Sequence, residues 1–219
     1  MTQIETTLPT SAWKDVVIRE NDDKMIVPEL KTVKLEKGLW DSEEEPCYLV
    51  RSTVSSMLLA ASENLPDDYR LGLVEGYRNE ESQKKKWNNA INFLKNKYPD
   101  LTDEKITAKA SLVVALPSPL ANHNCGGAVD VVLLDYRGAL VDMGCAAQSN
   151  DPEEARMFSS HINEGQIKNR SILRDAMVKA GFVYYPGEWW HYCYGDRMWA
   201  VYSGKKESFY GPVTQKLFE

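Results

Sequence analysis

The sequence predicts an α+β fold: a single domain with a mainly antiparallel sheet and helices packed around it. Segments with apolar residues at helical spacing come early in the chain and recur between short apolar runs that resemble strands. The strand-like runs near the end of the chain follow one another across short turns, as antiparallel strands do. The 219 residues contain no internal repeat and no evident linker, which is typical of one domain with a sizeable core.

The first part of the chain differs from the rest. Residues 1–45 have weak periodicity and one plausible extended piece, at residues 25–35. We therefore expect residues 1–45 to form an N-terminal arm that packs on the domain. Residues 46–219 are expected to form the domain itself.

Several segments of the domain are predicted to be helical because their apolar residues recur every three or four positions. Asn79, Thr102 and Asp151 are residues that cap helix starts, and a proline follows Asp151 at the first helical position. Gly181 stands just past the last helical segment, where glycine is favoured. The predicted helices are residues 48–64, 80–98 and 103–114, a helix that begins after Asp151 and carries His161, and residues 171–180.

Strands are predicted where short apolar runs lie between turn residues. Residues 128–134 are continuously apolar apart from Asp130, which predicts a buried strand. A turn at residues 136–138 follows this run. The other predicted strands are residues 69–77, a short strand ending at Met143, residues 182–185, residues 189–194 and residues 198–202.

Composition excludes some classes of partner. Hydrophobic residues make up 43% of the chain and charged residues 26%, which is ordinary for a soluble globular protein. The net charge of -6 argues against a nucleic-acid partner, because binding to phosphate backbones needs clustered basic residues. The one basic cluster, Lys84-Lys85-Lys86, lies on a predicted helix and is interpreted as a solvated face.

The sequence also allows predictions about the cellular location of the protein. Residues 1–20 contain no apolar run long enough for a secretory signal or a membrane span, so we expect a cytoplasmic protein with no membrane partner. Four cysteines without paired spacing are too few for a disulfide scaffold in a chain of this length. We interpret all four as reduced thiols.

Two of the three histidines stand beside carboxylates. His123 opens the run His123-Asn124-Cys125-Gly126-Gly127-Ala128-Val129-Asp130, and Glu188 lies three residues before His191. A carboxylate inside an apolar strand, such as Asp130, is costly unless it is paired or bound to a metal. On a regular strand Glu188 and His191 would point to opposite faces, so we expect a bend at Pro186-Gly187 to aim both at one point.

These four residues provide what a catalytic zinc site requires. Such a site takes three protein ligands, keeps a position for water, and uses a separate base. His123, Asp130 and His191 can act as the ligands and Glu188 as the base. The pattern therefore predicts one Zn2+ per chain in a hydrolytic site.

At these positions the sequence resembles the zinc D-alanyl-D-alanine dipeptidases of the VanX type, within the wider group of zinc DD-peptidases. Residues 121–130 match the family's Ser-x-His-x-x-Gly-x-Ala-x-Asp pattern, except that Ala121 replaces the serine. Residues 188–191 match its Glu-x-Trp-His pattern, and Arg78 matches an arginine that follows Gly-Tyr. The order of elements from about residue 47 to residue 200 is also similar.

The resemblance implies a zinc-dependent dipeptidase with a zinc DD-peptidase-like fold, whose peptidase domain would span residues 46–219. Its substrate would be a small peptide, of the kind found in cell-wall peptidoglycan, hydrolysed by a zinc-activated water. Zinc would be held by His123, Asp130 and His191, and Glu188 would take the proton of the water. The resemblance assigns to Arg78 the stabilisation of negative charge on the carbonyl oxygen.

Three departures from the family pattern concern the substrate. Ala121 lacks the hydroxyl that the family places near the metal, and the family's Tyr-Ala-Thr segment has no clear match around residues 32–38. Gln148 stands where the family has an acid that meets a free ammonium group. We therefore predict that the substrate is not simply free D-Ala-D-Ala handled as in typical relatives, because Gln148 in place of a carboxylate should penalise substrates with a free amine. A comparison of D-Ala-D-Ala, other dipeptides and amine-blocked or longer peptides would decide. The alternative is that Asp151 takes over the role of the acid.

Other readings of the same residues remain open. Cys125 and His123 could form a cysteine hydrolase site, and the chain could be a peptide-binding or metal-binding relative without catalysis. Arg78 could form a structural ion pair, and Asp130 could hold a loop by hydrogen bonds. His161 has no acid-rich motif around it and is interpreted as a structural or surface residue.

Overall fold

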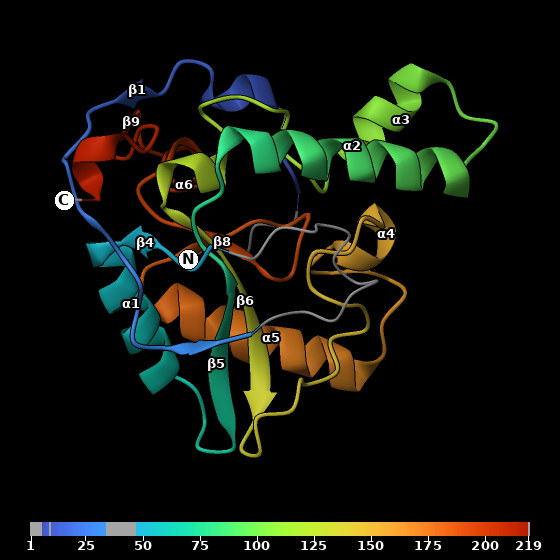
Figure 1. The fold of residues 1–219 in the computed structure, drawn as a ribbon. Coiled ribbons are helices and arrows are strands. Elements are labelled where there is room, and N and C mark those ends of the chain that lie inside the picture. The colour runs from blue at the N-terminus through green and yellow to red at the C-terminus, as the bar shows by residue number, and fades with distance from the viewer. Residues whose placement is uncertain (1–5, 9, 34–46, 219) are drawn as a thin grey trace.

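A five-stranded sheet lies at the centre of the fold (Figure 1). The protein is described by a computed structural model that covers residues 6–8, 10–33 and 47–218. The order across the sheet is β3 (Lys31–Thr32), β5 (Tyr69–Glu75), β6 (Ala128–Asp135), β8 (His191–Cys193) and β7 (Val183–Tyr184). Strand β3 runs parallel to β5, and the other pairings in this sheet are antiparallel. The predicted α+β fold with a mainly antiparallel sheet is confirmed.

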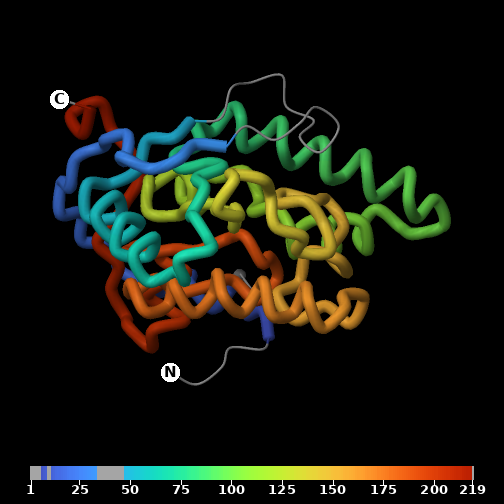
Figure 2. The backbone as a smooth tube through the Cα atoms, turned by 90° about the horizontal axis from the view of Figure 1, so that it is seen from below, coloured from blue at the N-terminus to red at the C-terminus, as the bar shows by residue number. Residues whose placement is uncertain are grey.

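Helices α1 (Ser52–Glu63) and α5 (Glu164–Lys179) pack against one face of the sheet and contact each other. Figure 1 shows α5 passing behind β5 and β6, and Figure 2 shows α1 and α5 side by side. Helix α2 (Glu80–Lys97) crosses the end of the sheet and pairs with α3 (Asp103–Ala110). Within the described residues, no helix has both the length and the apolar character needed to cross a membrane.

The remaining elements are short. They comprise the helices α4 (Pro152–Ala155) and α6 (Arg197–Tyr202) and the 3-10 helices η1 (Thr10–Trp13), η2 (Asn122–Cys125) and η3 (Gln215–Leu217). Two small ladders pair β1 (Val17–Ile18) with β9 (Glu207–Ser208) and β2 (Met25–Ile26) with β4 (Val50–Arg51). Strands β1, β2 and β3 thus tie residues 17–32 to later parts of the chain.

The expected N-terminal arm is only partly covered, because residues 1–5, 9 and 34–45 lie outside the described residues. The division of the chain at residue 45 therefore stays a prediction. The described part of this segment is held by a fully buried arginine, Arg51. Its Nε donates to the carbonyl of Cys125 at 2.7 Å, and its Nη1 pairs with Glu20 at 2.9 Å.

Most of the predicted helix caps are present. The Asn79 side chain accepts from the Ser82 amide at the start of α2, and the Asp151 side chain caps α4. Gly181 follows α5 with φ of 102°, a backbone conformation that glycine adopts without strain. Thr102 precedes α3 as predicted, but its side chain makes no capping hydrogen bond.

The strand predicted at residues 198–202 is wrong, because these residues belong to helix α6. A short apolar run has no period that separates a strand from a buried helix. The Asp196 side chain accepts from the Trp199 amide at 2.7 Å, and this cap starts a helix where the pattern alone predicted a strand.

Four predicted helices have different bounds. Helix α3 ends at Ala110, four residues before the predicted end at residue 114. The helix expected to carry His161 ends at Ala155, because Arg156 has the extended ψ of 136°, and His161 lies in an exposed turn. Helix α5 begins at Glu164, seven residues before the predicted start at Ser171, because Asn163 and Gln166 form a capping box. Helix α1 begins later than predicted, since Val50 and Arg51 pair with β2.

Candidate metal centre

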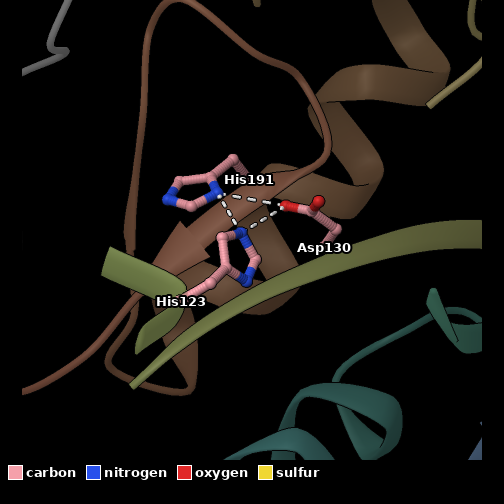
Figure 3. Close-up of side chains that lie close together, drawn as sticks. All are labelled: His123, Asp130 and His191. Atoms are coloured by element: carbon pink, nitrogen blue, oxygen red, sulfur yellow. Dashed lines mark hydrogen bonds and ion pairs between the residues drawn. The ribbon is translucent and has the colours of Figure 1, made fainter. Parts of the chain in front are cut away.

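Three side chains from separate segments converge on one point (Figure 3). His123 comes from η2, Asp130 from β6 and His191 from β8, and all three are buried. Asp130 Oδ1 lies 3.0 Å from His191 Nδ1 and 3.3 Å from His123 Nε2, and the two ring nitrogens are 3.2 Å apart. These residues are the ones that the two sequence motifs predicted as metal ligands.

The spacing of these atoms fits a small divalent ion. A tetrahedral zinc ion with ligands at 2.0–2.1 Å keeps its ligand atoms roughly 3.3 Å apart. The three contacts of 3.0 to 3.3 Å match this separation. Two imidazoles and one carboxylate are also ligands that zinc accepts. The cluster could therefore hold a metal ion without rearrangement of the strands.

The orientation of His123 is set by a backbone carbonyl. Its Nδ1 lies 2.7 Å from the oxygen of Gly76, and a carbonyl can only accept, so Nδ1 carries the proton. When Nε2 carries no proton, as metal binding requires, its lone pair is directed toward Asp130 and His191. A carbonyl that fixes the tautomer in this way is a common support of histidine ligands. Gly76 is required there, because a Cβ on it would lie 2.3 Å from the Leu49 carbonyl oxygen.

Strand pairing places a second carboxylate beside the cluster. Asp130 is opposite His191 on one side and opposite Glu75 of β5 on the other. The pairing of β5 with β6 shifts register between Leu73 and Glu75, so a bulge sets Glu75 opposite Asp130. Bulges beside functional sites commonly re-aim a side chain. Here the bulge places Glu75 next to Asp130, which in turn lies next to His191 on the neighbouring strand.

Glu188 reaches the cluster from a turn, as predicted. Its amide donates to the Tyr185 carbonyl across Pro186-Gly187, and the His191 amide points back to the Glu188 carbonyl at 3.4 Å. This geometry brings Glu188 Oε2 to 3.7 Å from His191 Nδ1. The predicted bend is therefore confirmed, and it places Glu188 and His191 on one side of the chain.

The pKa values of the two buried carboxylates, Asp130 and Glu188, are shifted in opposite directions. Burial would raise the pKa of Asp130, but the charge and hydrogen bonds of His123 and His191 outweigh it and hold this pKa well below its usual value. Burial, and then the charge of Asp130, raise the pKa of Glu188 well above its usual value. A bound dication would oppose the shift at Glu188. Asp130 is thus an ionised candidate ligand, whereas the carboxyl group of Glu188 can bind and release a proton.

Arg78 is fixed beside the centre. Its Nε donates to Glu75 Oε1 at 2.9 Å, its Nη2 contacts Glu75 Oε2, and its Nη1 donates to Gln83 Oε1 at 2.9 Å. Nη2 lies 3.9 Å from Asp130 Oδ2. The structural ion pair considered for Arg78 therefore exists, and the same guanidinium also lines the cavity of the site.

The basic cluster on α2 is not simply a solvated face. The side chain of Lys86 is 17% exposed and lies 3.2 Å from Glu75 Oε2, whereas that of Lys85 is 51% exposed. Burial would raise the pKa of Glu75, but Arg78 and Lys86 bring it down to about 2. The interpretation of Lys86 as solvated is wrong, because it lies next to the buried stripe that contains Gln83, Ala90 and Leu94.

Sequence reasoning missed Glu75, although a signal was present. Glu75 ends an apolar run, Leu71 to Val74, in the same way that Asp130 interrupts one. An acid at such a position needs a partner, and the argument used for Asp130 applies to Glu75. Gln83 and Lys86 carried no comparable signal, because their partners lie outside α2: Arg78 and Ala115 for Gln83, and Glu75 for Lys86.

A cavity of about 580 Å3 opens onto the centre. His123, Asp130, His191, Glu188 and Arg78 all line it. Its other walls come from the loop of residues 111–121 and from residues 7, 8, 13 and 14. The volume lies in the range of small-molecule sites.

The residues that the sequence linked to substrate recognition lie in different places. Gln148 lines the cavity, and Ala121 does so as well. Asp151 is not among the cavity residues, and its carboxylate pairs with Lys97 while capping α4. Asp151 is therefore not placed to replace the missing acid.

The fold and the cluster define an α+β domain with a candidate metal site, and comparisons with known proteins identify its family. The profile of the Peptidase_M15 family, described as D-ala-D-ala dipeptidase, matches residues 37–209. The chain belongs to this family, which confirms the resemblance found in its motifs.

Curated relatives match a shorter stretch. The chain is 36% identical over 90 residues to a D-alanyl-D-alanine dipeptidase of Synechocystis, covering 36% of each chain. It is 32% identical over 93 residues to the D-alanyl-D-alanine dipeptidase of Escherichia coli K12, covering 39% of this chain and 48% of that one. The chain thus matches between about a third and a half of the length of these relatives.

Two solved structures are similar over most of their length. One is the LdcB LD-carboxypeptidase, with a TM-score of 0.47, 16% identity and coverage of 94% of both chains. The other is a VanY D,D-pentapeptidase variant in complex with Zn(II), with a TM-score of 0.43, 17% identity and coverage of 88% of this chain and 96% of that one.

Proposed function

We propose that the protein is a zinc-dependent peptidase that hydrolyses a small D-amino-acid peptide, as the name of its relatives suggests. The observation that carries the proposal is the convergence of His123 Nε2, Asp130 Oδ1 and His191 Nδ1 within 4.8 Å of one another, at a cavity that also contains Glu188. A purely structural metal site has no need of a separate carboxylate. Glu188 therefore favours catalysis over metal binding alone.

In this proposal His123, Asp130 and His191 hold one zinc ion per chain. Zinc in such a position supplies Lewis acidity, which polarises a carbonyl group and lowers the pKa of water. The remaining work falls to the side chains of the protein. Glu188 accepts a proton from the attacking water and passes it to the departing amine, so that one peptide bond and one water become a carboxylate and an amine.

Arg78 stabilises the charge that develops on the carbonyl oxygen. A fixed cation is most effective there because its environment needs no reorganisation during the reaction. Glu75 and Gln83 hold the guanidinium through three of its nitrogens, which gives Arg78 the required rigidity. Glu75 is then a positioning residue for Arg78.

The decisive experiment combines metal analysis with hydrolysis of D-Ala-D-Ala and of blocked peptides, with and without a chelator. We expect one zinc per chain and activity that is lost with the chelator and restored by zinc. His123→Ala and His191→Ala should lose zinc, while His161→Ala, a change at an exposed turn, should keep it. Full zinc in either ligand variant would contradict the ligand assignment.

Glu188→Gln separates the base from the ligands. The variant should keep zinc and the fold but lose about 10²–10⁴-fold in kcat, the usual contribution of general base catalysis. Turnover similar to that of the unchanged protein would remove Glu188 from the mechanism. Loss of zinc would instead make it a ligand.

A further inference from the structure

Gln148 is held in an unusual position beside the candidate metal centre. It is 6% exposed, and its φ of 63° lies in the left-handed region that residues other than glycine rarely adopt. Its Nε2 donates to Asp130 Oδ2 at 2.5 Å and to Glu75 Oε2 at 2.7 Å. Local strain of this kind persists where the surroundings fix the residue, and it is concentrated at functional sites.

These contacts fix which way the amide faces. Both carboxylates are acceptors, so only the NH2 group of Gln148 can meet them, and the amide cannot be flipped. The carbonyl oxygen Oε1 is then directed elsewhere. Oε1 is buried, and among the described residues it has no hydrogen-bond partner, although Gln148 lines the cavity. A buried acceptor without a donor is costly, so this atom is suited to a donor on a ligand.

The position of Gln148 indicates which part of a peptide it would meet. Its amide contacts Oδ2 of Asp130, whose Oδ1 belongs to the ligand cluster. When the carbonyl that is to be cleaved lies at this cluster, the N–H bonded to its carbon belongs to the leaving amine, which Glu188 protonates. The next donor along the substrate is the backbone nitrogen of the residue that carries the carbonyl. That nitrogen is two bonds from the carbonyl carbon. It is an ammonium in a free dipeptide and a neutral amide N–H in an acylated peptide.

The charges around the cavity favour the neutral donor. Within the part of the chain that the structure describes, the basic residues that line it are Lys14, Arg78, Lys86 and Arg197, and the acidic residues are Asp130 and Glu188. Asp130 belongs to the metal cluster and Glu188 is assigned to proton transfer, so neither serves as the partner of an ammonium. An ammonium in a closed site without a paired carboxylate pays its full desolvation cost.

We infer that Gln148 selects the substrate: its Oε1 accepts a hydrogen bond from the amide N–H of the residue that carries the cleaved carbonyl. The substrate class is therefore an N-acylated peptide, such as the end of a longer chain, rather than a free dipeptide. This inference rests on the proposed peptidase function and specifies its substrate.

The test compares three peptides on the zinc-loaded protein: D-Ala-D-Ala, N-acetyl-D-Ala-D-Ala, and the acetylated peptide methylated on the first alanine nitrogen. The acetylated peptide should have at least a tenfold higher kcat/KM than the free dipeptide. Methylation removes the N–H donor and should lower kcat/KM about three- to tenfold, the range of one neutral hydrogen bond.

The matched variant is Gln148→Met, which keeps the size of the side chain and removes Oε1. Methylation of the substrate should have no effect on kcat/KM in this variant, whereas a steric effect of the methyl group would persist. Gln148→Glu should shift preference toward the free dipeptide. Should the Met variant lose zinc or its fold, the methylated peptide still tests the hydrogen bond on the unchanged protein.

Three outcomes separate this inference from the proposed function. Hydrolysis of free D-Ala-D-Ala as fast as the acetylated peptide, or of the methylated peptide without loss, overturns the role of Gln148 and leaves the zinc peptidase standing. Absence of hydrolysis for every peptide rejects the proposed function. In that event calorimetry decides: tighter binding of the acetylated than of the methylated peptide supports Gln148, and equal binding overturns it.

Discussion

Asp130 shows how much a single residue type in its context can reveal. It is the one charged residue within the apolar run of residues 128–134, and burial of an unpaired carboxylate is too costly to be accidental. The structure surrounds it with His123, His191 and Gln148. The alternative that Asp130 holds a loop by hydrogen bonds is also met, because Gln148 lies on a loop and donates to Asp130 Oδ2. The same carboxylate contacts both histidines through Oδ1.

Cys125 is predicted to have no part in catalysis. Its thiol donates to the Asn122 carbonyl at 2.8 Å, it is absent from the residues that line the cavity, and burial raises its pKa. A neutral thiol is a poor nucleophile. Cys125→Ser should therefore keep zinc and most of the activity, measured by metal analysis and peptide hydrolysis. Lost activity with full zinc would favour the cysteine hydrolase instead.

Asp196 should give the fold a specific pH dependence. Burial raises its pKa to about 6, against the opposing hydrogen bond from the Trp199 amide. Because the folded pKa is above the unfolded one, this contribution to stability is complete below pH 4 and is lost as the pH rises through 6. The shift corresponds to about 3 kcal/mol at most.

The matched variant for this prediction is Asp196→Asn, because asparagine caps helices about as well as aspartate and carries no charge. Urea unfolding of the metal-free protein at pH 4 and pH 8 measures the effect. The loss of stability between the two pH values should be smaller in Asp196→Asn than in the unchanged protein. Equal losses in both proteins would show that Asp196 titrates normally.

At the scale of elements, the caps decided where helices begin more reliably than apolar spacing did. Helix α5 begins at a capping box of Asn163 and Gln166 that apolar spacing alone did not reveal, and α6 begins at the Asp196 cap. In the sheet, the register of strand pairing decides which side chains lie opposite each other. One bulge in β5 determines that Glu75 faces Asp130 and thereby reaches Arg78.

The capping box of α5 should contribute measurably to stability. Asn163→Ala removes an acceptor for the Gln166 amide, and loss of such a cap costs about 1 kcal/mol. Urea unfolding should show this decrease in the free energy of unfolding. Thr102→Ala is the control, because Thr102 precedes α3 without a side-chain capping bond, and its effect should be smaller. A larger effect at Thr102 would refute the assignment.

At the scale of the whole molecule, Arg51 joins segments that are far apart in sequence. Besides Glu20 and Cys125, its guanidinium contacts the carbonyls of Asp23 and Gly211. The arginine thereby connects the N-terminal segment, the 3-10 helix η2 that contains His123, and the C-terminal part of the chain. The candidate metal ligand His123 is two residues from one of these anchors, Cys125.

Arg51→Met should destabilise the fold strongly, by roughly 3–5 kcal/mol, because it leaves buried acceptors and Glu20 without their partner. Arg19→Ala is the matched control, since the Arg19–Glu207 pair is 68% and 53% exposed and such surface pairs contribute 1 kcal/mol or less, as an order-of-magnitude figure. Thermal unfolding compares the two variants. Similar small losses would mean that Arg51 has no such structural role.

The sequence by itself determined the fold class, most helix and strand positions, and the residues that form the cluster of His123, Asp130 and His191. These features depend on local periodicity, on caps and on short motifs, which a single segment of chain displays. Family membership confirmed the resemblance that those motifs carried.

Only the tertiary structure decided what surrounds these residues. Glu75, Lys86 and Gln148 come from β5, from α2 and from a loop, and their contacts depend on a bulge, on a helix orientation and on one left-handed residue. None of these three features has a sequence period. They arise because packing of distant segments fixes charges and amides at distances that no local pattern specifies.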